Sequence, residues 1–322
     1  MATSSAGERR HRDRAFAPQD VPPGTGDGID WLGGLPFLAV HAACLAVVWT
    51  GVSPIAVAVG AVTLLTRMFG LTAGYHRYFC HRTFRTTRAF QFVLAWLGAS
   101  AAQMGPLWWA GHHRSHHRHS DTGDDVHSPS AQGFRTAHFG WILSRANQRT
   151  KTEWVPDLLR FPELRWLDRN HYLAPLVLGA ALFALGEWLG ATSPELGTDG
   201  AQLVVVALFW STTALYHITF AVNSLAHRYG SRRYDTGDDS RNLWWLALIT
   251  AGEGWHNNHH RYPTSERQGF YWWECDLTHY GIVVLSWLGI VWDVRGPAPA
   301  VLEEGARRSA RSLRAESRPA WR

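Results

Sequence analysis

The fold is decided by residues 35–71, which read LPFLAVHAACLAVVWTGVSPIAVAVGAVTLLTRMFGL. Most of them lie in the segment 31–66, which contains no lysine or arginine. The short break Thr50-Gly-Val-Ser-Pro54 divides the stretch into two apolar parts, at about 35–49 and 55–75. Each part approaches the roughly 20 residues that a helix needs to cross a bilayer. The stretch therefore predicts a hairpin of two membrane-spanning helices.

A second hairpin has the same pattern between His171 and His227, where lysine and arginine are again absent. Its spans are predicted at about 172–190 and 203–225, and the turn between them carries acidic but no basic residues. Arginines flank the ends of both hairpins that lie away from the turns. By the positive-inside rule, both turns lie outside the cell and both termini lie in the cytoplasm.

The expected architecture is an all-α membrane protein with four transmembrane helices in two hairpins and a cytoplasmic helical cap. One domain is predicted at 31–295, with cytoplasmic parts at about 76–171 and 226–295. The flanking segments, 1–30 and the basic 296–322, are predicted to be disordered tails.

Two further apolar stretches are not assigned as spans. Phe90–Trp109 contains two glutamines and a proline, and we expect a buried or interfacial helix that returns to the same face. As a fifth span it would separate the first two histidine motifs. Ile282–Val294 is too short to cross and is expected to pack on the cytoplasmic part.

Composition agrees with a membrane protein that has a substantial aqueous part. The hydrophobic fraction is 46%, and the mean hydropathy is −0.17. The arginines are spread along the chain and absent from its apolar stretches, which favours a membrane surface over nucleic acid as the partner. The three cysteines are isolated, so no disulfide framework is expected and the location is reducing.

Eight of the eighteen histidines fall into three motifs. These are His76-Arg-Tyr-Phe-Cys-His81, His113-Arg-Ser-His116-His117 and His256-Asn-Asn-His259-His260. Imidazole is the commonest metal ligand, and eight are too many for one ion and about right for two. In His-x-x-His-His the three histidines share one helical face. His76 and His81 are about 140° apart on an α-helix, so they converge only if the helix ends or bends.

Ligand histidines usually donate their second ring nitrogen to an acceptor. The candidate acceptors are the carboxylates of Asp121, Asp124, Asp125, Asp235, Asp238, Asp239 and Glu253. Each of them, taken alone, is also explained as a solvated carboxylate in a loop.

The choice of metal follows from chemistry. The absence of Cys-x-x-Cys argues against a structural zinc site, while copper also accepts imidazole. A pair of redox-active irons is favoured because the site is expected beside a membrane, where a lipid chain is a candidate substrate. Breaking an unactivated C–H bond of such a chain requires an oxidant formed from oxygen. Two other classes stay open: a non-catalytic haem- or metal-binding membrane protein that uses His41 and His217, and a zinc transporter. A zinc transporter predicts acidic or histidine residues inside the spans, which hold few.

The chain resembles the membrane-bound fatty-acid desaturases of the stearoyl-CoA Δ9 type from about Leu65 to Arg295. The resemblance rests on six stretches in combination. They are Gly74-Tyr-His-Arg-Tyr-Phe-Cys-His-Arg82, His113-Arg-Ser-His-His117, Gly133-Phe with His138-Phe-Gly-Trp141, Asn223-Ser-Leu-Ala-His227, Gly252-Glu-Gly-Trp-His-Asn-Asn-His-His260 and Ser286-Trp-Leu-Gly-Ile-Val-Trp-Asp293.

The resemblance implies two irons held by nine histidines, with no catalytic residue apart from the ligands. It adds His227 to the motif histidines, excludes His112, and implies that Asn223 approaches one metal through water. The implied ligands are His76, His81, His113, His116, His117, His227, His256, His259 and His260.

The implied reaction inserts a cis double bond between carbons 9 and 10 of a saturated acyl chain and reduces O2 to water. Electrons come from an external ferredoxin, or from cytochrome b5 with its reductase. A bent apolar tunnel holds the acyl chain, and the candidates for its wall are Trp108, Trp109, Trp141 and Trp255. A lipid hydroxylase with similar histidine motifs is the nearest alternative.

One departure concerns the acyl carrier. Animal acyl-CoA members of the family have Arg-Asp just before the second histidine motif, where those residues contact the CoA head group. Here the positions hold Gly111 and His112. The carrier is therefore open between CoA, a carrier protein and a membrane lipid.

Overall fold

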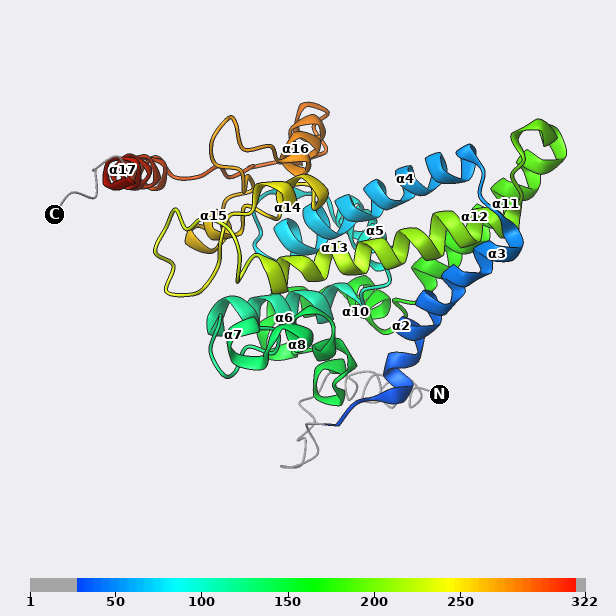
Figure 1. Ribbon diagram of the computed structural model, residues 1–322, viewed down its shortest axis with the longest axis horizontal. Helices are drawn as coiled ribbons and strands as arrows, with labels where there is room; N and C mark the ends of the chain where they lie inside the picture. Colours follow the sequence, from blue (N-terminus) through cyan, green and yellow to red (C-terminus); the bar gives the residue numbers. More distant parts are fainter. Residues whose placement is uncertain (1–27, 317–322) are drawn as a thin grey trace, which may run out of the picture.

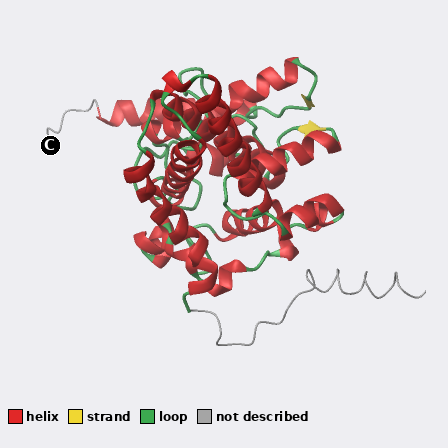
Figure 2. Ribbon diagram, turned by 90° about the vertical axis from the view of Figure 1, so that its right-hand side faces the viewer, coloured by secondary structure: helices red, strands yellow, loops and turns green. Residues whose placement is uncertain are grey.

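The computed structural model describes residues 28–316, which are mainly helical with two short strands (Figure 2). The predicted N-terminal tail lies outside these residues except for its last three positions. Four helical rods are long and apolar enough to cross a membrane, as the sequence predicted. They cover Trp31–Thr50, Pro54–Cys80, Leu173–Thr192 and Gly200–Leu225.

Most rods contain more than one helical type. The first comprises α2 (Trp31–Ala43), the 3₁₀ helix η1 (Cys44–Ala46) and α3 (Val47–Thr50). The second comprises α4 (Pro54–Phe69) and the π-helix η2 (Gly70–Cys80). The third is α11 (Leu173–Thr192), and the fourth comprises α12 (Gly200–Leu203), the π-helix η7 (Val204–Trp210) and α13 (Ser211–Leu225).

The turns of the two hairpins lie together at one end of the molecule. The Ser53 and Thr198 hydroxyls form a hydrogen bond, and Gln202 Nε2 donates to the Thr50 carbonyl at 3.1 Å. Ser53 also caps α4, whose first residue is Pro54, as is usual for a helix start. The elements that carry the histidine motifs gather at the opposite end (Figure 1).

The stretch Phe90–Trp109 forms two helices that reverse direction, α5 (Arg88–Ser100) and α6 (Pro106–His119). The chain turns between them through Ala102 and Met104, which have φ of 58° and 66°. α5 packs so closely on η2 that a Cβ on Gly98 would lie 2.3 Å from the Tyr75 ring. The expected return to the same face is confirmed, because His81 of the first motif meets His113 of α6.

Short elements complete the end that carries the histidines. Between α6 and α11 they are α7 (Pro129–Gln132), α8 (Phe134–His138), η3 (Gly140–Leu143), η4 (Arg145–Gln148), η5 (Thr152–Trp154), α9 (Pro156–Leu159) and α10 (Pro162–Arg169). After α13 they are α14 (Trp244–Ile249), α15 (His256–Arg261) and α16 (Leu277–Trp287). η6 (Pro194–Leu196) lies in the second turn, and β1 (Arg85–Thr86) pairs antiparallel with β2 (Val291–Trp292). α16 is too short to span, as expected.

The C-terminal segment differs from its expectation. Residues predicted as a disordered tail form α17 (Pro299–Glu316), which extends from the body of the molecule (Figure 1). Its first turns are held by Tyr234 and Tyr271, whose hydroxyls donate to the Val301 and Leu302 carbonyls at 3.0 and 2.7 Å. Val301 is buried in a small cluster with Tyr234. This packing is long-range, and a local reading of an arginine-rich segment does not detect it.

Candidate metal centre

The first histidine motif is brought together by a π-helical segment. In a π-helix each N–H bonds to the carbonyl five residues earlier, and His81 N–H donates to the His76 carbonyl at 3.3 Å. The two imidazole rings consequently lie with centroids 4.9 Å apart. The helix ends at Cys80. His76 and His81 therefore converge for two reasons: the segment is π-helical, and the helix ends at Cys80.

Five histidines form one cluster, which we call the five-histidine group. One ring nitrogen of each histidine lies within 4.8 Å of one ring nitrogen of every other. The Nε2 atoms of His76 and His259 are 3.0 Å apart, and those of His81 and His113 are 2.9 Å apart. All three motifs contribute, with these members: His76, His81, His113, His117 and His259.

Four further histidines form the four-histidine group: His116, His227, His256 and His260. Their ligand atoms also lie within 4.8 Å of one another, and the Nε2 atoms of His227 and His256 are 2.9 Å apart. The two groups adjoin, since the rings of His117 and His260 stack at 4.5 Å. All nine histidines singled out on the sequence are therefore gathered in one place. His227 lies just past the C-terminal end of α13.

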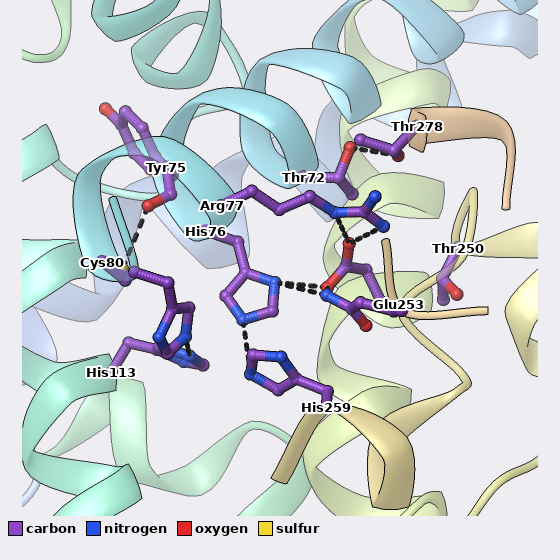
Figure 3. Close-up of polar contacts among 12 residues, drawn as sticks. Thr72, Tyr75, His76, Arg77, Cys80, His113, Thr250, Glu253, His259 and Thr278 are labelled. Atoms are coloured by element: carbon purple, nitrogen blue, oxygen red, sulfur yellow. Dashed lines mark hydrogen bonds and ion pairs between the residues drawn. The ribbon is translucent and has the colours of Figure 1, made fainter. Parts of the chain in front are cut away.

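Carboxylates hold several of the clustered histidine rings from behind. His76 Nδ1 bonds to Glu253, while its Nε2 faces His259 (Figure 3). In the four-histidine group His116, His227 and His260 donate Nδ1–H to aspartates at 2.9, 2.8 and 2.7 Å, namely Asp125, Asp121 and Asp238. Among the seven candidates from the sequence, these four acids contact histidines of the two groups. The side chains of Asp124 and Asp235 are exposed, and Asp239 donates its backbone N–H to Asp121.

Burial favours the neutral form, which a metal requires, in several of the clustered histidines. It lowers the pKa of His81, His113 and His259 well below the usual value, and neighbouring histidines lower it further. The pKa of His260 falls to about 4, mainly through burial. With Nδ1 bound to Asp238, the buried Nε2 of His260 has no hydrogen-bond partner within residues 28–316. Inward Nε2 atoms and outward Nδ1–H bonds fit ligands of iron, zinc or copper.

Buried residues that the sequence did not reveal fix the elements around the first and third motifs. Arg77 has a side chain only 1% exposed and forms ion pairs with Glu253, Glu266 and Asp276 at 3.0, 3.4 and 2.9 Å. Gln268 donates to Glu253 at 2.7 Å and so orients the acid that holds His76. A feature of the sequence could have indicated this cluster, because Arg77 is a charged residue next to His76 in a largely apolar stretch.

The two asparagines inside the third motif are structural. Asn258 donates to the Gln268 carbonyl and to Glu274, both at 2.9 Å. Asn257 accepts from the Tyr234 N–H at 2.7 Å. These bonds attach α15 to the loops on either side of it, which fixes the direction of its histidines.

An apolar cavity of about 330 Å³ leads to the metal centre. Trp108, Trp109 and Trp141 line it, as the sequence suggested, but Trp255 is not among its lining residues. Trp255 instead precedes α15, and its indole N–H donates to the Cys275 carbonyl at 2.8 Å.

A second cavity of about 50 Å³ lies beyond the first. The two cavities share Trp109, His113, Thr219 and Asn223. The two cavities therefore adjoin beside the five-histidine group, and Asn223 lines both of them.

Histidines outside the two groups have other partners. His112 is buried and bonds through Nε2 to the Arg149 carbonyl at 3.1 Å. The Nε2 atoms of His41 and His217 lie 3.1 Å apart, and His217 Nδ1 lies 3.1 Å from His138 Nε2. A direct contact between His41 and His217 leaves no space for a haem plane between them.

His127 was not singled out on the sequence. It lies with His116 and Asp125 close enough to hold an ion. Because His116 also belongs to the four-histidine group, this triplet overlaps that site.

These features define a class: an integral membrane protein with paired histidine clusters that could hold metal, at the end of an apolar cavity. Comparison with known sequences gives the family. The pattern of the family described as fatty acid desaturase matches residues 53–283, and this chain belongs to that family. Its activity is therefore that of an oxidoreductase on fatty acyl chains.

Curated relatives cover most of the chain. An sn-1 stearoyl-lipid 9-desaturase of Anabaena variabilis is 36% identical over 270 residues, which are 83% of this chain and 94% of the relative. An sn-2 palmitoyl-lipid 9-desaturase of Nostoc sp. (strain 36) is 35% identical, over 75% of this chain and 83% of the relative. Acyl-CoA 5-desaturase AL21 of Anemone leveillei is 36% identical, over 72% and 68%. Both acyl lipids and acyl-CoA therefore occur among the substrates named for these relatives.

Proposed function

We propose that this protein is an oxygen-dependent acyl desaturase that forms a cis double bond between carbons 9 and 10 of a saturated chain. The observation that carries the proposal is the pair of adjoining cavities beside the histidine centre. An acyl chain that occupied both cavities would present mid-chain carbons at Asn223 and His113, which line both. Two of the relatives named above are 9-desaturases, which supports this position for the bond.

In this proposal the nine histidines hold two irons, and bound iron supplies the oxidant that removes hydrogen from the acyl chain. The residues of the chain have defined tasks. The four carboxylates fix the histidine rings, and Asn223 holds a water beside the four-histidine group. Trp109, whose ring stacks on His113 at 5.1 Å, keeps the acyl chain against the site and excludes bulk water. Electrons come from an external ferredoxin or cytochrome b5.

For the acyl carrier we propose a membrane lipid rather than CoA. A Cβ on Gly111 would lie 2.8 Å from the Lys151 carbonyl, so this position has no room for a side chain. His112 is buried and bonded to the Arg149 carbonyl, and burial lowers its pKa to about 3, which leaves it uncharged. Neither position offers a charge to a nucleotide head group. For the topology we propose that the metal centre and both termini face the cytoplasm.

The test is expression in cells that lack their own desaturase, followed by mapping of double bonds in the lipid fatty acids. A new Δ9 bond in cells with the wild-type chain, absent with the His259→Ala variant, is the expected result. A hydroxylated acyl product without an alkene would overturn the proposal in favour of a hydroxylase. Purified protein in nanodiscs, given labelled stearoyl-CoA or labelled stearoyl-phosphatidylglycerol with reduced ferredoxin, distinguishes the carriers.

A further inference from the structure

The two histidine groups differ in the charge that surrounds them. In the five-histidine group, the only carboxylate within residues 28–316 in ion-pair contact with a ring is Glu253, which lies behind His76. Glu253 also pairs with Arg77 at 3.0 Å, a cation that it shares with Glu266 and Asp276. In the four-histidine group, three of the four rings are held by separate aspartates. These pairs are His116–Asp125, His227–Asp121 and His260–Asp238.

The remaining contacts of the three aspartates come from hydroxyls, from backbone amides and, for Asp125, from His127 Nδ1 at 3.3 Å. Ser128 and the Asp239 N–H donate to Asp121 at 2.7 and 2.8 Å. Thr236 donates to Asp238 at 2.6 Å. Such donors stabilise the ionised carboxylates without cancelling their charge.

The charge difference acts directly on a bound cation, because the ligands themselves are neutral imidazoles. A buried site screens charge poorly, so three carboxylates behind three ligand rings attract a cation strongly. Each of these bonds also makes the imidazole a better donor to metal. The five-histidine group has one more neutral ligand, but within residues 28–316 only one of its rings is in ion-pair contact with a carboxylate, and that carboxylate also contacts the cation Arg77.

On the premise of the di-iron centre proposed above, we propose that the two metal positions are unequal. The four-histidine group binds its ion more tightly, and it holds the ferric ion when the pair has been reduced by one electron. Asp121, Asp125 and Asp238 are the positioning residues that create this inequality through His227, His116 and His260.

The first experiment measures iron release from purified, iron-loaded protein in nanodiscs under a chelator, with zinc titration calorimetry as a second readout. The wild type should lose one iron per chain readily and retain the other. Asp238→Asn should weaken the retained iron by about 10–100-fold, so that both irons leave together. Asp121→Asn tests the same step if Asp238→Asn does not fold. The matched control, Glu253→Gln, should weaken only the labile iron.

The second experiment uses Mössbauer spectra after one electron per chain has been added from dithionite. Asp238→Asn should alter the ferric signal and leave the ferrous signal, and Glu253→Gln should do the reverse. Release of both irons from the wild type at one rate would overturn the proposal, as would a retained iron that is insensitive to both aspartate variants. These readouts do not require turnover. If the protein proved to be a hydroxylase whose two irons bind with different strength, only the proposed function would be refuted. If it proved to be a desaturase whose two irons bind equally, only this inference would be refuted.

Discussion

Each hairpin combines an outer rod with an inner rod, and the contrast between them is the main lesson of the fold. The outer rods, Trp31–Thr50 and Leu173–Thr192, have only 6% and 17% of their most apolar stretch buried. In the inner rods, Pro54–Cys80 and Gly200–Leu225, the fractions are 44% and 50%. The inner rods contain the π-helical segments, and only they lead into metal-centre residues. Hydropathy predicts all four rods equally. Burial distinguishes the outer rods, which form the scaffold, from the inner rods, which lead into the site.

The largest effect should come from exchanging a histidine of the metal centre. His259 faces both His76 and His117 through Nε2, at 3.0 and 2.9 Å. We expect His259→Ala to abolish double-bond formation and to lower bound iron, since it opens the five-histidine group. His116→Ala should do the same in the other group. The measurements are fatty-acid analysis of expressing cells and metal content of the purified protein.

The matched control for that prediction is His41 on the outer rod. Its Nε2 contacts His217 rather than either histidine group. His41→Ala should therefore retain iron and most of the activity. Full turnover by His259→Ala would contradict the site assignment, and equal loss in both variants would remove the distinction between inner and outer rods.

The next effect concerns the charge buried beneath the inner rod. Arg77→Met would leave three buried carboxylates without their cation, and breaking a buried pair in this way costs about 3–5 kcal/mol. Arg85 pairs with Asp293 at 3.2 Å, but their side chains are 70% and 57% exposed. Arg85→Met should therefore cost no more than about 1 kcal/mol. Thermal unfolding in detergent measures both, and similar shifts would show that the Arg77 cluster does not stabilise the fold.

A smaller effect should separate two helical glycines. Gly98 of α5 faces Tyr75 on the inner rod, where overpacking costs about 1–3 kcal/mol. That cost exceeds the gain of about 0.5–1 kcal/mol that alanine brings to a helix. Gly179 lies on the outer rod, and a Cβ there would meet only the end of the Leu208 side chain, at 3.1 Å. Gly98→Ala should lower the melting temperature and Gly179→Ala should leave it nearly unchanged. A larger loss of melting temperature for Gly179→Ala than for Gly98→Ala would mean that α5 accommodates an added methyl group more easily than α11.

The sequence predicted what depends on local pattern. Long stretches without basic residues identified the four rods, and the spacing in His-x-x-His-His identified faces that converge. The position of His227 came from resemblance, because a lone histidine after a span has no local signal.

What the sequence did not predict depends on distant contacts. The π-helical segment η2 packs closely against α5, a contact between residues that are not adjacent in the sequence. The aspartates that contact histidines differ from their neighbours only in the folded chain. Asp124 and Asp125 are adjacent, yet only Asp125 reaches His116. α17 is likewise ordered at its start by Tyr234 and Tyr271, which lie far away in the sequence.

The smallest effect is a pH dependence at the end of the inner rod. Asp157 accepts from Arg114 at 2.7 Å and from Arg82 at 2.9 Å. Burial would raise the pKa of Asp157, but Arg114 and Arg82 outweigh it and lower the pKa from 3.8 to about 2. A carboxyl whose pKa is lower in the folded than in the unfolded protein stabilises the fold at pH values above its unfolded-state pKa. This contribution is lost as the pH falls through the folded-state pKa. Because these side chains are partly exposed, the contribution should stay below about 1 kcal/mol.

The test compares the metal-free wild type with Asp157→Asn by thermal unfolding. The wild type should be the more stable at pH 6, and the difference should shrink as the pH falls from about 4 towards 2. Metal-free protein is required because acid also releases metal from histidines. A difference that stays constant or grows down to the lowest accessible pH would show that Asp157 acts by packing rather than by charge. The link between the inner rod and α6 would then not depend on the ion pairs of Asp157 with Arg82 and Arg114.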